Sequence, residues 1–320
     1  MDILWSSTEL TRIIFVAGAI LALVYKKRMG VTPGGIIVPG ILAGILFASV
    51  PAFIMAIATA LACYGVYKVT FGRFALDKRW TALVLITMST VIGLVQAYVL
   101  NAYHLFGSEL LLMSLVVPGL MAISMRRYGV KKVLGGTMAV TMLCYAFGWL
   151  LLWLIPYGMV TQLTVMLASY QPLVLQNSFV LLPLSLAMAI FLHYKFGIRG
   201  GGYLIAPFIA EIAFSSPVQL LLVGGGTLLC YAVVRLALKY TLIIGLERFV
   251  LGIIAATLVI TAIDMLAAHW TIPGYRPSAL IMIVALAICT NDLVLQPAKK
   301  TLTQGFSINL AVAMLARGVV

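Results

Sequence analysis

Residues 133–155 read VLGGTMAVTMLCYAFGWLLLWLI, an apolar run in which no side chain is charged. An α-helix rises about 1.5 Å per residue, so about 20 apolar residues cross the hydrocarbon core of a bilayer. Runs of this kind recur along the whole chain and leave no stretch over for a soluble domain. The sequence therefore predicts an all-α, polytopic membrane protein.

The composition argues against a water-soluble fold. Hydrophobic residues make up 63% of the chain and charged residues only 9%, whereas soluble domains carry about 25% charged residues. The formal net charge of +13 would suit a nucleic-acid ligand, but the known binding motifs are absent and the basic residues lie beside apolar runs. Membrane topology explains this charge better, and we expect no nucleic-acid partner.

The chain carries no recognisable catalytic or metal-binding motif. It has no P-loop, no HExxH and no nucleophile elbow. Cys63, Cys144, Cys230 and Cys289 lie inside apolar runs without CxxC spacing, so we predict no disulfide framework and no zinc site. We therefore expect no catalytic residue, metal or cofactor in this chain alone, and a partner would have to supply the chemistry.

We expect about twelve membrane segments, some of them short or broken. They cover residues 10–26, 35–49, 51–70, 80–99, 109–125, 133–155, 178–195, 202–215, 217–238, 249–268, 278–292 and 301–317. With both termini outside, all but three of the 21 Lys and Arg residues fall at inside ends and loops. The three exceptions are Arg12, Arg276 and Arg317. This bias is what the positive-inside rule produces.

The basic residues at the inside ends are candidates for attracting an acidic polymer, anionic lipid or an acidic partner. The alternative is that they only set the orientation of the chain in the membrane. The candidates are Lys26, Lys27, Arg28, Arg79, Arg126, Arg127, Lys131, Lys132, Lys195, Arg199, Arg248, Lys299 and Lys300.

The chain repeats itself at an offset near 167 residues. The stretch GVTPGGIIVPG at 30–40 aligns with GIRGGGYLIAP at 197–207, and Cys63 and Tyr64 fall on Cys230 and Tyr231. Six segments per copy would make the two repeats parallel in the membrane. We predict a first membrane repeat at 1–156, an extracytoplasmic or interfacial connector at 157–176 and a second repeat at 177–320.

Helix-breaking residues recur at matching places in the two copies. We expect the backbone to bend or unwind there, and opened backbone in a bilayer must be buried against protein or line a watery cavity. Such paired breaks point to a central translocation site, and the alternative is close helix packing through small residues. The candidates are Gly30, Pro33, Gly34, Gly35, Pro39 and Gly40 in the first copy and Gly197, Gly200, Gly201, Gly202 and Pro207 in the second. Pro118 and Gly119 within 109–125 are a further break that the second copy lacks, where it has Ala285 and Leu286.

Glu211 is the acid that the sequence places deepest in an apolar segment. A buried carboxylate must be paired, protonated or wetted, so Glu211 has either a functional role or a structural partner. Asp264 lies near the outer end of its segment, and we expect it to reach the membrane interface. The three histidines fall at loops and segment ends and are expected to be solvated.

At the glycine-rich stretch the sequence resembles the CapC/PgsC family, the membrane subunit of bacterial poly-γ-glutamate synthase. The resemblance lies in GVTPGGIIVPGILA at 30–43 and in Val117, Pro118 and Gly119 followed by Gly129. Asn291 and Asp292 are similar to the family's Asn-Asp pair. Each half of this chain corresponds to one ordinary member, so the resemblance is to a tandem fusion.

The resemblance implies a place in a capsule synthesis and export complex. In that family a cytosolic ATP-dependent amide ligase lengthens the anionic polymer, and an extracytoplasmic capsule subunit is a further partner. It also implies a multi-pass protein of the bacterial cytoplasmic membrane, surrounded by lipid, that anchors the ligase and helps the polymer across.

Two other functions stay open on the sequence. One is an autonomous secondary transporter of a small anionic solute that uses the paired breaks and Glu211. The other is a membrane enzyme for a lipid-linked substrate that uses Glu211 or Asp292.

Overall fold

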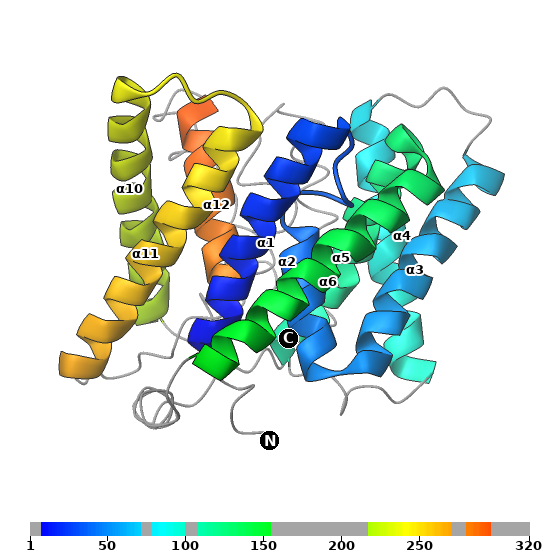
Figure 1. The fold of residues 1–320 in the computed structure, drawn as a ribbon, viewed down its shortest axis with the longest axis horizontal. Helices are drawn as coiled ribbons and strands as arrows, with labels where there is room; N and C mark the ends of the chain where they lie inside the picture. Colours follow the sequence, from blue (N-terminus) through cyan, green and yellow to red (C-terminus); the bar gives the residue numbers. More distant parts are fainter. Residues whose placement is uncertain (1–7, 72–77, 100–107, 155–216, 271–279, 296–320) are drawn as a thin grey trace. The chain divides into compact units, whose positions relative to one another are not determined.

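The computed structural model describes residues 8–71, 78–99, 108–154, 217–270 and 280–295. Within these ranges every regular element is an α-helix, which confirms the all-α prediction (Figure 1). The chain divides into two compact units, Met1–Thr164 and Val165–Val320. The proposed connector at 157–176 lies outside the described residues, so its role stays a prediction.

The described part of the first unit contains six helices. Their bounds are α1 Thr8–Met29, α2 Val38–Ala48, α3 Val50–Thr70, α4 Lys78–Val99, α5 Ser108–Tyr128 and α6 Val130–Leu154. Two of these helices end at a glycine. Gly30 follows α1 and Gly129 follows α5, and their positive φ angles of 69° and 88° are incompatible with a continuing α-helix. Ser49 starts α3, since its side chain accepts a hydrogen bond from the amide of Ala52 at 3.4 Å.

The described part of the second unit contains α10 Pro217–Tyr240, α11 Leu246–Trp270 and α12 Leu280–Leu295. Pro217 opens α10, where its missing N–H costs no intrahelical bond. Gly245, with φ of 65°, precedes α11. These helices pack as a trio in which α12 contacts both α10 and α11.

The same trio is present in the first unit. There α5 packs against both α3 and α4, and a core cluster of Cys63, Tyr67, Leu85 and Ala122 joins the three helices. The helices α10, α11 and α12 follow α3, α4 and α5 at the offset seen in the sequence. The internal repeat is therefore a repeat of packed structure as well as of residues.

Four of the described helices are long and apolar enough to cross a bilayer: Val50–Thr70, Val130–Leu154, Val218–Tyr240 and Leu246–Ala267. Their surfaces carry large exposed apolar side chains, including Val69, Leu221 and Trp153, the last 84% exposed. Hydrocarbon is the solvent that suits such surfaces, and the chain is a membrane protein. The segments 178–195, 202–215 and 301–317 lie outside the described residues, so the total of twelve stays a prediction.

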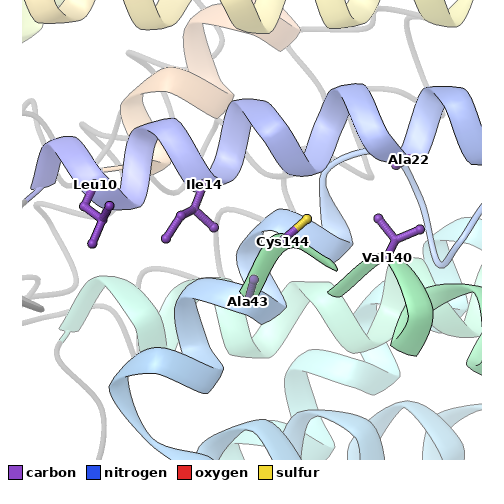
Figure 2. Close-up of a cluster of buried hydrophobic side chains, with 6 residues drawn as sticks. All are labelled: Leu10, Ile14, Ala22, Ala43, Val140 and Cys144. Carbon is purple, nitrogen blue, oxygen red and sulfur yellow. The ribbon is translucent and has the colours of Figure 1, made fainter. Parts of the chain in front are cut away.

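A second core in the first unit joins α1, α2 and α6. Figure 2 shows Leu10 and Ile14 of α1 pointing toward the ribbons from which Ala43 and Cys144 extend. The backbones of α1 and α2 touch beside this cluster, because a Cβ atom on Gly18 would lie only 2.4 Å from the Cα of Gly40. The two helices can approach this closely only because both positions are glycine.

At two of the predicted breaks the backbone is helical. Pro39 and Gly40 lie inside α2, where Pro39 occupies the first turn and so removes no intrahelical hydrogen bond. Pro118 and Gly119 lie inside α5, which continues through the proline. Gly119 serves close packing, since a Cβ atom there would lie 3.0 Å from the Cα of Ile86 on α4. At Gly40 and Gly119 the missing side chain serves close helix packing, and a part in translocation stays a prediction.

Two charged residues lie deeper than the sequence suggested. Asp264 of α11 was expected at the membrane interface, but only 3% of its surface is exposed. Arg12, which the topology placed among the outside residues, is 1% exposed within α1. Hydropathy averaged over a segment does not register the packing around a single side chain, and the side of the membrane on which these residues lie stays a prediction.

Candidate functional site

Between α1 and α2 the backbone leaves the helical conformation from Gly30 to Ile37, a segment named here the glycine loop. Gly30 and Gly34 have φ angles of 69° and 70°, and Gly35 has 132°, a region that residues with side chains rarely adopt. Pro33 and Gly34 are buried. The predicted unwinding is therefore confirmed for Gly30 to Gly35.

The glycine loop is covered by helices that arrive later in the chain. A Cβ atom on Gly34 would lie 3.0 Å from Cγ of Met121 on α5 and 3.1 Å from Oγ1 of Thr137 on α6. The ring of Tyr25, just before the loop, lies against Gly136 of α6. The opened backbone is thus buried against protein, as a bilayer requires.

Exposed cations gather at the end of the first unit where the glycine loop lies. Helix α1 ends at this end of the unit. Helix α5 ends at Tyr128 and α6 begins two residues later, at Val130. The end of α3 also lies here, because Arg126 of α5 packs over the ring of Tyr67 on α3. The exposed cations of this basic end are Lys27, Arg28, Lys68, Arg126, Arg127, Lys131 and Lys132, and Lys26 is half-buried. The structure therefore brings together in one place two sets of candidates that the sequence named separately.

Arg126 is the best anchored of these cations. Its guanidinium lies over the ring of Tyr67 on α3, 5.4 Å from the centroid, and it donates a hydrogen bond to the hydroxyl of Thr81 on α4. Tyr67 in turn stacks on Phe71, with 6.3 Å between ring centroids. Because one arginine bridges three helices, its position is set before any ligand arrives.

The second unit has a related polar link at the matching end of its trio. Nε of Arg248 on α11 donates to Oδ1 of Asn291 on α12 at 3.3 Å, and the neighbouring Asp292 is buried. The repeat brings Arg248 near Arg79 of α4. The arginine of the link is supplied by α5 in the first unit and by α11 in the second.

Arg235, near the end of α10, is held by its own helix. Its guanidinium donates to the hydroxyl of Tyr231 at 2.6 Å and lies 5.6 Å from the centre of that ring. Lys68 holds the equivalent place on α3, where it is exposed.

Several predicted site residues lie outside the described part of the chain. They are Lys195, Gly197, Arg199, Gly200, Gly201, Gly202, Pro207, Glu211, Lys299 and Lys300. The backbone of Arg79 lies in α4, but the structure does not describe its side chain. The second broken segment and any role for Glu211 therefore stay predictions.

The four cysteines are free thiols. Cys63, Cys144 and Cys230 are buried and Cys289 is half-buried. Within the described ranges no group of three or more His, Cys, Asp or Glu residues is placed to hold a metal ion.

Sequence reasoning missed two features of this site. The bridge from Arg126 to Tyr67 and Thr81 joins residues far apart in the chain, and no short motif announces it. The other is Thr137, whose hydroxyl faces the glycine loop. The spacing of Thr137 and Thr141, four residues apart on α6, is the signal that could have drawn attention to it.

Comparison with known proteins agrees with the duplicated architecture. The family described as capsule biosynthesis CapC matches residues 17–134 and again residues 184–302. The capsule biosynthesis protein CapC of Bacillus anthracis is 28% identical over 131 residues, which cover 39% of this chain and 84% of that protein. No solved structure matches. The two family matches repeat the sequence offset and together cover most of the chain, which therefore belongs to the CapC capsule biosynthesis family as a tandem form.

Proposed function

We propose that this capsule biosynthesis protein is a non-catalytic integral membrane subunit of a poly-γ-glutamate synthesis and export complex. In this proposal its basic end anchors a cytosolic ATP-dependent amide ligase, and the chain assists the polymer across the membrane to an extracytoplasmic subunit. The observation that carries the proposal is the position of the buried glycine loop at the same end as the exposed cations.

Electrostatics favours an acidic partner at the basic end. Poly-γ-glutamate carries one carboxylate per residue, and the acidic surface of a ligase would present the same chemistry. A cluster of like charges raises the local concentration of such a partner and speeds its association. Arg126 adds to this because it is already fixed on Tyr67 and loses little side-chain freedom on binding.

The orientation of the chain follows from the same charges. The positive-inside rule places the basic end at the cytosolic face of the bacterial inner membrane. Polymer made by a cytosolic ligase would meet this end first. Anionic lipid would compete for the same cations, at about 1 kcal/mol for each Lys or Arg near the surface.

The test separates binding from topology. Lys131→Gln and Lys132→Gln remove two exposed cations at the start of α6, and the matched controls Lys131→Arg and Lys132→Arg keep the charge. We expect the glutamine pair to lower surface polymer and co-purification of the ligase, and the arginine pair to preserve both. Accessibility labelling of the loops in each variant checks that the orientation is unchanged.

Two outcomes would contradict the proposal. The first is a glutamine pair that retains the normal orientation, polymer yield and ligase association. The second is a purified chain that alone moves a small solute into liposomes down an ion gradient, because that result would identify an autonomous transporter.

A further inference from the structure

Threonine hydroxyls in and just after helices commonly bond to the carbonyl four residues earlier, and several in this chain do so. Thr90, for example, is 1% exposed and donates to the carbonyl oxygen of Ile86 at 3.0 Å. The same bond, between 2.6 and 2.9 Å long, is made by Thr59, Thr70, Thr227, Thr241 and Thr257.

Three threonines depart from this pattern. Within the part of the chain that the structure describes, the Oγ1 atoms of Thr137, Thr141 and Thr290 are buried and make no hydrogen bond. All three residues are 0% exposed. A hydroxyl buried without a partner is unfavourable, above all in a bilayer, so these three require an explanation.

The three hydroxyls lie beside the two motifs of the chain. The Oγ1 of Thr137 lies 3.1 Å from the point where a Cβ atom of Gly34 would stand, and Thr141 follows one turn further along α6. Thr290 directly precedes Asn291 and Asp292. The glycine loop therefore adjoins a hydroxyl that the polypeptide leaves unbonded, and the Asn-Asp pair is preceded in sequence by another.

We propose that Thr137 and Thr141 form a buried hydroxyl site beneath the glycine loop, which hydrogen-bonds amide and carboxylate oxygens of the anionic polymer in transit. This rests on the proposed function. A neutral hydroxyl is a suitable donor to such oxygens, and it does not trap a polyanion as a buried cation would. The exposed cations of the basic end would gather the polymer, and the hydroxyls would receive it once the loop moves aside.

Gly34 is the loop residue that lies nearest the hydroxyl of Thr137 among the contacts known for the loop. Its left-handed conformation and its lack of a side chain leave room there that a Cβ atom would fill, beside the side chains of Met121 and Val38. In this proposal the glycine loop is the cover of the hydroxyl site.

The experiment replaces hydroxyls by methyl groups of the same shape. The Thr137→Val, Thr141→Val pair removes the donors, the Thr137→Ser, Thr141→Ser pair keeps them, and Thr90→Val removes a hydroxyl that is already bonded. Surface polymer per cell is measured relative to the amount of chain in the membrane, and the unfolding temperature is measured on purified chain in detergent.

We expect the valine pair to lower polymer yield about fivefold for each donor that the polymer uses, the factor that corresponds to one lost hydrogen bond. Its unfolding temperature should equal or exceed that of the wild type, because the hydroxyls make no bond within the fold. The serine pair should retain the yield. Thr90→Val should do the reverse of the valine pair, with a lower unfolding temperature and an unchanged yield.

A normal yield from the valine pair, at normal abundance, would overturn the site, as would a serine pair that fails equally. If the protein with the valine pair does not accumulate in the membrane, the polymer yield of Thr137→Val alone is compared with that of the wild type by the same criterion. Deletion of the whole chain separates this inference from the proposed function. A deletion strain that still exports polymer refutes the function, whereas polymer loss on deletion with a normal valine pair refutes only the hydroxyl site.

Discussion

The contact between the α1 and α2 backbones yields a quantitative prediction. In Gly18→Ala the new Cβ would lie 2.4 Å from the Cα and 2.6 Å from the amide nitrogen of Gly40, where ordinary contact begins at 3.4 Å. Both atoms belong to the backbone, so no side-chain rotation can relieve the clash. The two helices would have to separate by about 1 Å, which opens the core around Ile14 and Cys144.

The magnitude follows from two opposing terms. Overpacking of this kind costs about 1–3 kcal/mol, and a clash with rigid backbone belongs at the upper end. Replacing a helical glycine by alanine returns about 1 kcal/mol of helix propensity. We therefore expect Gly18→Ala to lower the free energy of unfolding by about 2 kcal/mol.

Gly44→Ala is the matched control in α2. Its new Cβ would lie 3.6 Å from Cγ2 of Thr11, an ordinary contact, so only the gain in propensity remains. The assay is unfolding of the purified chain in detergent, followed by helical signal against added denaturing detergent. Equal stability of Gly18→Ala and Gly44→Ala would refute the close approach of the two backbones.

Three further outcomes are expected. Gly34→Ala should lower polymer yield, measured at the cell surface, because its φ of 70° and its near neighbours both oppose a Cβ atom; a normal yield would contradict this. Tyr67→Leu should lower the unfolding free energy by more than the about 0.5–1 kcal/mol of its cation–π contact, because Tyr67 is also buried and stacks on Phe71; combined with Arg126→Gln it should cost less than the sum of the two single variants, since both remove that one contact. Asn291→Ala should destabilise the chain by about 1 kcal/mol by removing the acceptor of Arg248, and Asn291→Asp should restore most of that loss in the same unfolding assay.

The positions of the helices were readable from the sequence because a bilayer allows few alternatives. In lipid the backbone N–H and C=O groups of an apolar run must form hydrogen bonds within the protein, and a helix provides them. The length of an uncharged apolar run therefore predicts the position of a helix closely. The prediction of 133–155 thus corresponds to α6 at Val130–Leu154, and 51–70 to α3 at Val50–Thr70. The residues at which the glycine loop opens, Gly30 to Gly35, were readable from their density of helix-breaking glycine and proline.

The interior was less predictable, because it depends on which helices meet. Pro118 suggested an interruption by its local chemistry, yet α5 continues, because neighbouring helices enclose it and Gly119 admits α4 at close range. The burial of Asp264 depends on the surfaces packed over it rather than on its place within a segment. Side-chain bridges such as that of Arg126 are tertiary by nature and leave no mark in hydropathy.

The fusion of two copies explains why the polar links of the two trios differ. In an assembly of identical short chains, any substitution appears in every copy, so two copies cannot carry different links. Joined in one chain, the copies vary independently. Arg126 of α5 therefore bridges to Thr81 of α4 in one half, while Arg248 of α11, which the repeat brings near Arg79, bridges to Asn291 of α12 in the other. Both links join the second and third helices of their trio, through residues at different positions. This difference also leaves Arg126 beside the glycine loop of the first half, where the proposed function needs a fixed cation.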